Sequence, residues 1–275
     1  MVLPVHDVNP TRRTPYVTYL LIVANVVVFL MSPLALAPLV GDAGRVQQCA
    51  IATYLARYAV EPAELVTGRP QQRVPTPVAA VERRTGRVGC VAEQPPSFHK
   101  SPFLSVLTAM FLHGGWLHLL GNMLFLYVFG NNVEDRLGRL RFLVFYLFCG
   151  YAATYGFALF QPTSTEPLVG ASGAIAGVLG AYLVMFPRAK VWSLLTFLFF
   201  LPVRLPAWLV LGSWFVLQYA YVRGAGLARG SGVAYGAHVV GFLVGAALAW
   251  RSAIPRPPAS PARSPAARRA RRTAG

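Results

Sequence analysis

Residues 102–130 read PFLSVLTAMFLHGGWLHLLGNMLFLYVFG, a stretch without any aspartate, glutamate, lysine or arginine. The apolar core of a lipid bilayer is about 30 Å thick, and a helix needs roughly 20 mostly apolar residues to cross it. The stretch is long enough for that, and it is longer and more apolar than the helices of soluble proteins. The sequence therefore predicts an integral membrane protein.

Further apolar runs lie on both sides of this stretch. Their approximate bounds are 16–40, 142–160, 168–186, 191–222 and 233–250. The run 191–222 is too long for one ordinary span, and Pro202 and Pro206 interrupt it. We expect a re-entrant or interfacial piece over 191–205, followed by one span over about 206–222.

The predicted fold class is all-α, a polytopic membrane bundle of six transmembrane helices. Lysine and arginine beside spans favour the cytoplasmic side. With the N-terminus inside, the basic residues of 136–141 and 188–190 also fall inside, whereas the link 161–167 has none. The predicted organisation is a cytoplasmic N-terminus, a six-span domain with a long extracytoplasmic first loop, and a basic, disordered cytoplasmic tail: residues 1–15, 16–250 with the loop at 41–101, and 251–275.

The composition argues against a soluble domain and against nucleic acid as the partner. Only 12% of the 275 residues are charged, whereas a soluble domain usually has about 25%. The net charge is +16, and seven of the 25 basic residues lie in the tail. A basic tail after a last span is typical of a cytoplasmic end and of contact with membrane lipids. The excess of Arg over Lys, with abundant Ala, Gly and Val, suggests a GC-rich bacterial genome. The predicted location is therefore a bacterial plasma membrane.

The chain has three cysteines, and they fall into two groups. Cys149 lies inside an apolar run, where a packing role is expected. Cys49 and Cys90 both lie in the long first loop, and they can form a disulfide if that loop faces an oxidising compartment. Their spacing leaves this pairing open.

Polar and ionisable side chains inside spans are costly, so each is a functional hypothesis. They gather in three motifs, FLHGGWLHLLGN (111–122), GASGA (170–174) and YGAHVVGFLVG (235–245). His118 and Asn122 are one turn apart and share a helix face, whereas His113 lies on another face nearer the outer end. In the predicted topology His118, Asn122, Ser172 and His238 all lie a few residues inside the same membrane face.

The glycine spacing explains how two of these motifs meet. Gly173 and Gly177 are four residues apart, as are Gly241 and Gly245. Small residues at this spacing let helix backbones approach closely. Packing of these faces brings the serine of GASGA and the histidine of the last span within hydrogen-bonding reach.

Such a pair is suited to nucleophilic catalysis. We expect Ser172 to act as the nucleophile and His238 as its general base. The helix start at Ser172 supplies free N–H groups for an oxyanion. His118 and Asn122 are donors that complete the oxyanion hole.

Together these motifs resemble those of the rhomboid intramembrane serine proteases. H-x4-H-x3-N on one span, GASGA on a later span and A-H-x2-G-x3-G on the last span occur in the family's order. The segments YAVEPAEL (58–65) and VEDRLGRLRFLVFY (133–146) are similar to the family's corresponding segments, and the resemblance covers about residues 16–250. It implies a six-helix core, a water-filled cavity open to the outer face, and a catalytic dyad without a third acid.

The resemblance also implies roles for individual residues. Ser172 and His238 match the catalytic pair, and His118 and Asn122 match the oxyanion-hole donors. His113 matches the family's first histidine, for which a hydrogen-bonding role in the loop region is implied. The remaining matches are packing or turn positions, at Gly170, Gly173, Gly241 and Gly245.

One position departs from the family pattern. Some members have an aromatic residue four positions after the serine, stacked on the catalytic histidine, but this chain has Ala176 there. Either another group orients His238 or the ring is held more loosely.

The predicted function is an intramembrane serine endopeptidase that cleaves transmembrane segments of membrane-protein substrates near the outer face. It requires no cofactor and no metal, and its partners are those substrates and membrane lipids. An inactive relative is the nearest alternative, and a transporter or channel is the main non-enzyme one. A zinc metalloprotease would need H-E-x-x-H, an aspartyl protease would need paired aspartates inside spans, and a bis-histidine haem protein would leave the serine motif unused.

Overall fold

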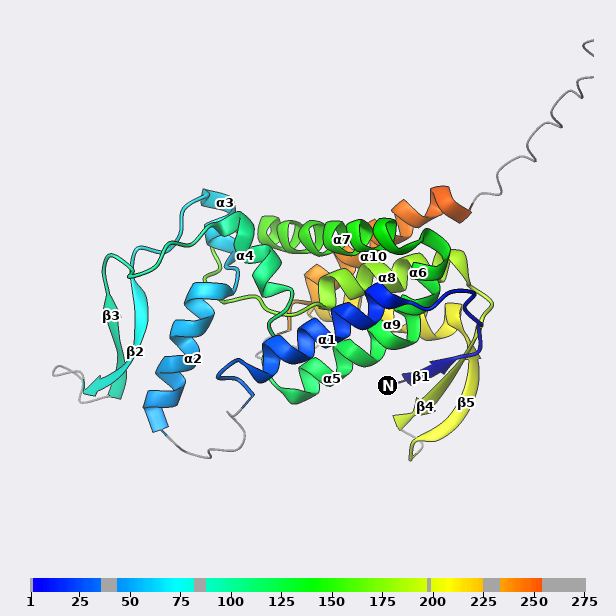
Figure 1. The fold of residues 1–275 in the computed structure, drawn as a ribbon, viewed down its shortest axis with the longest axis horizontal. Helices are drawn as coiled ribbons and strands as arrows, with labels where there is room; N and C mark the ends of the chain where they lie inside the picture. The colour runs from blue at the N-terminus through cyan, green and yellow to red at the C-terminus, as the bar shows by residue number, and fades with distance from the viewer. Residues whose placement is uncertain (1, 36–43, 82–87, 197–198, 225–232, 254–275) are drawn as a thin grey trace, which may run out of the picture.

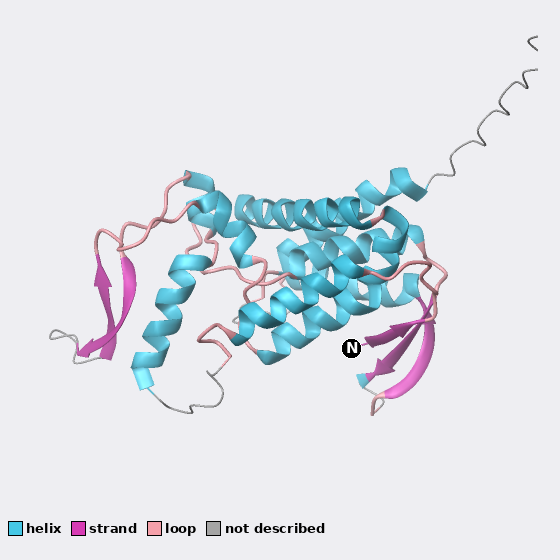
Figure 2. Ribbon diagram, viewed as in Figure 1, coloured by secondary structure: helices cyan, strands magenta, loops and turns pink. Residues whose placement is uncertain are grey.

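The computed structural model describes residues 2–35, 44–81, 88–196, 199–224 and 233–253. Helices fill the middle of the molecule, and a small sheet lies at each side (Figure 2). The helices are α1 (Tyr16–Leu30), α2 (Gly44–Tyr58), α3 (Pro62–Thr67), α4 (Pro102–Ala109), α5 (Trp116–Phe125), the π-helix η2 (Leu126–Gly130), α6 (Asn131–Leu137), α7 (Arg139–Phe160), α8 (Ser172–Met185), α9 (Ala207–Val222) and α10 (Tyr235–Ala253). The strands are β1 (Val2–Asp7), β2 (Val74–Val81), β3 (Val88–Glu93), β4 (Lys190–Leu195) and β5 (Leu201–Pro206).

The expected count of six spans is not confirmed. Among the described helices, α7 alone is both long and apolar enough to cross a membrane, with 22 residues. Four shorter apolar helices accompany it, at Tyr16–Leu30, Ser172–Met185, Ala207–Val222 and Tyr235–Trp250. A helix rises about 1.5 Å per residue, so these four are shorter than an apolar core of about 30 Å. The apolar runs include residues that the structure places in turns beyond the helix ends.

The stretch 102–130 is not one helix, which corrects the expectation of a single span. Helix α4 ends at Ala109 and α5 begins at Trp116. The link between them contains Gly114 and Gly115, and glycine is a poor helix former. From α5 the chain continues through η2 into α6 without interruption. The break places His113 in the link and His118 in the first turns of α5.

The fold is mostly helical, as expected, but it is not all-α, because the structure contains two small sheets. One has the strand order β1-β4-β5, with β4 antiparallel to both neighbours. Residues 191–205, expected to be re-entrant or interfacial, form most of the β4–β5 hairpin, and the N-terminal strand β1 completes the sheet. This pairing joins Val2 to Leu195 and so depends on contacts far apart in the sequence. Helix α9 then follows as a single helix from Ala207, as expected.

The first loop is a structured unit over its described residues. It contains α2, α3 and the antiparallel hairpin β2–β3. Cys49 and Cys90 form a disulfide, with Cα atoms 5.3 Å apart, that joins α2 to β3. Val60 and Leu168 exchange backbone hydrogen bonds of 3.3 and 2.7 Å, so this unit is tied to the link that precedes α8. Residues 36–43 and the predicted disordered tail from 254 onward lie outside the described residues.

Two buried carboxyl groups connect the bundle to its N-terminal segment. Glu134 of α6 accepts hydrogen bonds from the backbone N–H of Val17 at 3.0 Å and of Thr18 at 2.8 Å, and from the Thr18 hydroxyl at 2.8 Å. It therefore satisfies donors that the start of α1 leaves free. Asp7 of β1 accepts from the Tyr182 hydroxyl at 2.8 Å and from the Asn132 amide at 2.6 Å.

Candidate active site

Helices α8 and α10 pack backbone against backbone in the middle of the bundle, beside α7 (Figure 1). A Cβ atom built on Gly241 would lie 2.2 Å from the carbonyl oxygen of Gly173, and one built on Gly245 would lie 2.0 Å from that of Gly177. A methyl group cannot fit at either position without moving a helix. The structure thus has the close approach that the glycine spacing predicts.

This packing brings Ser172 and His238 together. Ser172 is the first residue of α8, and His238 lies in the first turn of α10. The Ser172 hydroxyl oxygen is 2.8 Å from His238 Nε2, although the residues are 66 positions apart in the chain. A hydroxyl that donates to an imidazole nitrogen can lose its proton to that nitrogen when it attacks an electrophile.

The other ring nitrogen of His238 has a partner that the sequence analysis missed. Nδ1 lies 2.8 Å from the amide oxygen of Gln218, a buried residue of α9. A carbonyl oxygen only accepts, so Nδ1 carries the proton and Nε2 has the lone pair that faces Ser172. A glutamine inside the apolar run of α9 is itself the signal that could have identified it.

Aromatic rings of α9 and α10 lie beside the same imidazole. The ring of Trp214 lies 5.9 Å from that of His238 at 33°, and the ring of Tyr235 lies 6.2 Å away, edge-on at 87°. Ala176 is fully buried and brings no ring to this place. The sequence left open which group orients His238 when position 176 is alanine. In the structure Trp214 lies beside the imidazole instead.

His118 lies on the other side of Ser172. The backbone N–H of Gly114 donates to His118 Nδ1 at 3.3 Å, so in the neutral ring Nε2 carries the proton. A Cβ built on Gly170 would lie 2.9 Å from His118 Nε2 and 3.7 Å from the Ser172 hydroxyl oxygen. Gly170 has φ +122°, which favours glycine. A small space therefore separates the His118 donor from the Ser172 hydroxyl.

Two further groups of donors lie nearby. The buried Asn122 amide donates one N–H to the carbonyl oxygen of His118 at 2.8 Å, which leaves its second N–H for another acceptor. Helix α8 has no side-chain cap, so the first backbone N–H groups from Ser172 onward have no partner within the helix. The backbone N–H of Gly170 is used differently, since it donates to the carbonyl oxygen of Ala109 at 2.9 Å and fixes the loop before α8.

His113 packs against His118. Its side chain is buried, and its ring lies 5.1 Å from that of His118 at 67°. Neither ring nitrogen makes a hydrogen bond within the described part of the chain. Likewise, no three histidine, cysteine or acidic side chains of the described residues come together in a way that could hold a metal ion.

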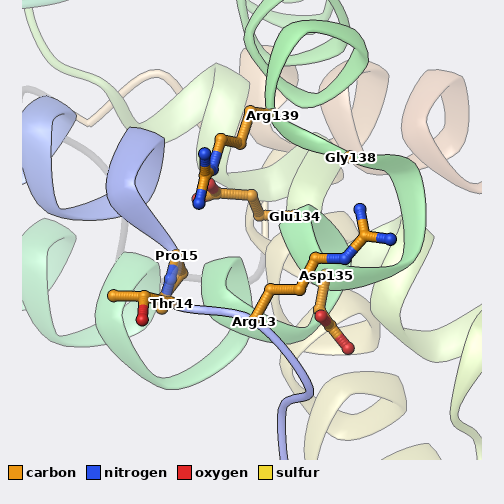
Figure 3. Close-up of a pocket in the computed structure, with 7 residues that line it drawn as sticks. All are labelled: Arg13, Thr14, Pro15, Glu134, Asp135, Gly138 and Arg139. Carbon is orange, nitrogen blue, oxygen red and sulfur yellow. The ribbon is translucent and has the colours of Figure 1, made fainter.

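A cavity of about 350 Å³ lies elsewhere, between the start of α1 and the turn from α6 to α7. Its lining residues are shown in Figure 3: Arg13, Thr14, Pro15, Glu134, Asp135, Gly138 and Arg139. The cavity is beside the beginning of α7, whereas Ser172 follows the end of that helix. It is therefore separate from the serine–histidine pair.

Comparison with known proteins decides the family. Residues 100–253, more than half of the chain, match the sequence model of the Rhomboid domain. The chain belongs to the rhomboid family. The matched region of this rhomboid chain contains the Ser172–His238 pair. It also contains His113, His118 and Asn122. Membership of the family implies an integral membrane protein.

Several curated relatives of this rhomboid chain cover only part of it. RHOMBOID-like protein 6, mitochondrial, of Arabidopsis thaliana is 37% identical over 106 residues, which are 36% of this chain and 34% of the relative. The putative rhomboid protease YdcA of Bacillus subtilis is 40% identical over 84 residues, 29% of this chain and 40% of the relative. Rhomboid protein 1, mitochondrial, of Saccharomyces cerevisiae is 36% identical over 110 residues, which are 38% of this chain and 30% of the relative. The chain thus spans less than half the length of each of these relatives.

Proposed function

We propose that this rhomboid chain is a serine-type intramembrane endopeptidase that cleaves transmembrane segments of other membrane proteins. One observation carries the proposal: the Ser172 hydroxyl is 2.8 Å from His238 Nε2. The relatives support the reaction class, since one of them is named a putative rhomboid protease. The pair also lies beside a donor, His118, across the space left by Gly170.

The proposed reaction begins when the Ser172 oxygen attacks the carbonyl carbon of the scissile peptide. Its proton passes to His238 Nε2. The carbonyl oxygen becomes an oxyanion in the space beside Gly170. There it accepts hydrogen bonds from His118 Nε2–H, the second N–H of Asn122 and the backbone N–H of Ser172.

The second half of the reaction releases both products. The imidazolium of His238 gives its proton to the leaving amine nitrogen as the C–N bond breaks, which leaves an ester on Ser172. A water molecule then attacks the ester carbon and gives a proton to His238. That proton returns to the Ser172 oxygen as the C–O bond breaks, so the enzyme is restored and the new carboxylate leaves.

The proposed orientation has both termini in the cytoplasm and the loop 41–101 outside, in a bacterial plasma membrane. The positive charge of 136–141 and 188–190 supports it. The Cys49–Cys90 disulfide supports it independently, because disulfides persist in oxidising compartments. The test fuses reporter enzymes after residue 275. A reporter that functions only in the cytoplasm should be active there, whereas activity of a reporter that functions only in the periplasm would contradict the orientation.

The substrate proposal follows from the depth of the site. Cleavage is expected near the outer face, where Ser172 starts α8, and in segments that unwind there, because an intact helix shields its carbonyl groups. Membrane lipids are the other proposed partners, contacting the exposed apolar side chains of α1 and α5.

The test uses the full chain purified in detergent with a fluorogenic transmembrane substrate. Ser172→Ala and His238→Ala should each lower cleavage by at least about 100-fold, because each removes one half of the proton-transfer pair. Thr154→Ala on α7, which removes only a hydroxyl bonded within its own helix, is the matched control. A fluorophosphonate should label Ser172 in the wild type and not in Ser172→Ala. Undiminished cleavage by Ser172→Ala would overturn the proposal.

A further inference from the structure

Gln218 is the group whose chemistry the proposed dyad leaves unused. Its side chain is 5% exposed, and its amide oxygen lies 2.8 Å from His238 Nδ1. The family pattern contains a pair without a third acid, so nothing in that pattern accounts for a polar acceptor at this place. We propose that Gln218 is a positioning residue that holds His238 in its Nδ1–H form and so completes a serine–histidine–glutamine chain. The inference rests on the proposed function and deepens it.

The geometry selects one tautomer of His238. If the proton were on Nε2, Nδ1 would present a lone pair to the lone pairs of the Gln218 oxygen at 2.8 Å, without a hydrogen between them. A buried acceptor that is left without a donor destabilises the structure. With the proton on Nδ1 this bond is made, and the Nε2 lone pair points at the Ser172 oxygen 2.8 Å away.

Helix α9 holds the ring with two residues that are one helical turn apart. Trp214 lies alongside the imidazole, and Gln218 accepts from it. Trp214 limits sideways movement of the imidazole ring. Gln218 fixes the rotation of the ring and keeps its proton on Nδ1. Both come from one helix, so the orientation of the base depends on α9, whereas the nucleophile belongs to α8.

An amide suits this position better than a carboxylate. The polar side chains that face the ring are Ser172 on α8, Tyr235 on α10 and His118 on α5, and none of them is a carboxylic acid. A buried carboxylate in an apolar bundle has a large desolvation penalty. The amide oxygen of Gln218 orients the ring and offers a dipole to the imidazolium without adding a buried charge.

The kinetic test compares two substitutions of nearly equal size. Gln218→Met fills the same volume and cannot accept a strong hydrogen bond, whereas Gln218→Glu keeps an acceptor oxygen. We expect Gln218→Met to lower kcat about 10- to 100-fold with KM nearly unchanged, since the base loses its orientation but the binding surface remains. Gln218→Glu should keep cleavage within about tenfold and move the acidic limb of kcat/KM to higher pH, because an anion stabilises the protonated ring.

A packing role predicts the opposite order. Methionine would then be tolerated and the buried glutamate would be the more damaging change. Ser213→Ala, which removes a hydroxyl bonded to Val210 within α9, is the matched control and should be neutral. Wild-type kcat in Gln218→Met, or equal loss in both variants, would overturn the proposal.

A second readout does not depend on proteolysis. Nitrogen-15 labelling of the five histidines, with His238→Ala used for assignment, reports the tautomer of His238 by NMR. The wild type should show Nδ1–H alone, and Gln218→Met should show a mixture of both tautomers. Identical His238 signals in the two proteins would overturn the inference even if the wild type cleaves. A tautomer change in a protein that cleaves nothing would sustain the inference and refute the proposed function.

Discussion

A Cβ atom on Gly245 would lie 2.0 Å from the carbonyl oxygen of Gly177, closer than any side chain can approach a backbone. Each helix therefore occupies the space that a side chain of the other would need. We expect Gly245→Ala to force α10 away from α8, with a loss of about 1–3 kcal/mol as in other overpacked cores. The Ser172–His238 distance should grow with it.

The measurement is the thermal melting of purified protein together with the rate of fluorophosphonate labelling at Ser172. Both should fall in Gly245→Ala. The matched control is Gly212→Ala in α9, where a Cβ would meet nothing within 4 Å. It should be neutral or slightly stabilising, because alanine is the better helix former by about 1 kcal/mol. Equal melting temperatures in the two variants would contradict the close approach.

Gly170→Ala should abolish cleavage through a different mechanism. The new methyl group would occupy the space 2.9 Å from His118 Nε2, where the oxyanion is proposed to form, at a φ of +122°. Loss of one oxyanion-hole interaction costs about 100- to 1,000-fold in kcat. Single-turnover cleavage would show this, with Gly121→Ala in α5, which meets nothing within 4 Å, as the control. Normal turnover in Gly170→Ala would place the oxyanion elsewhere.

Glu134→Ala should destabilise the protein without changing a contact of Ser172 or His238. Its carboxylate satisfies two backbone N–H groups of Val17 and Thr18 and one hydroxyl at the start of α1. Buried donors without an acceptor cost about 1–3 kcal/mol. The melting temperature should fall clearly, whereas Glu166→Ala, at an exposed position, should leave it unchanged. If the two variants melt alike, Glu134 does not anchor α1.

Asp7 makes stability depend on pH. Burial in the sheet raises the pKa of Asp7 above its ordinary 3.8, and the hydrogen bond from Tyr182 only partly opposes this. The folded protein thus holds this proton more tightly than the unfolded chain. The stabilisation is complete below pH 3.8 and is lost as the pH rises through the higher folded pKa.

Asp7→Asn removes this titration and keeps an acceptor for Tyr182 and Asn132. The melting temperature of the variant minus that of the wild type should therefore rise between about pH 4 and pH 7. Melting curves in a single detergent across that range provide the measurement, with Glu166→Gln at an exposed position as the control. If this difference in melting temperature instead falls as the pH rises, the hydrogen-bond donors stabilise the Asp7 carboxylate more than burial destabilises it.

The sequence predicts the features that depend on local composition. The apolar runs locate α7, α9 and α10 to within a few residues, because burial against lipid or protein demands continuous apolar side chains. The motifs also indicate the family, and the glycine spacing predicts the approach of α8 to α10. Each of these signals is contained in a short stretch of chain.

The features that the sequence did not predict depend on distant partners. The β1 strand exists because Val2–Asp7 pairs with β4, which begins only at Lys190. The break between α4 and α5 needed Gly114 and Gly115 to outweigh an otherwise apolar run. Gln218 was overlooked since its function follows from its distance to His238, which no pattern within α9 contains.

The backbone contact between α8 and α10 also has a consequence for motion. The proposed nucleophile and base lie on two helices whose backbones are in contact. A substrate helix about 10 Å wide would therefore have to enter where other helices separate. Outward movement of α9 would take Gln218 away from His238, and movement of α5 would take His118 away from Ser172. In either case the open molecule would lack one of the proposed catalytic contacts, and that contact would form again only after the helices close around the bound chain. Such an arrangement would prevent cleavage of neighbouring membrane proteins that enter the opening only briefly and leave before the helices close.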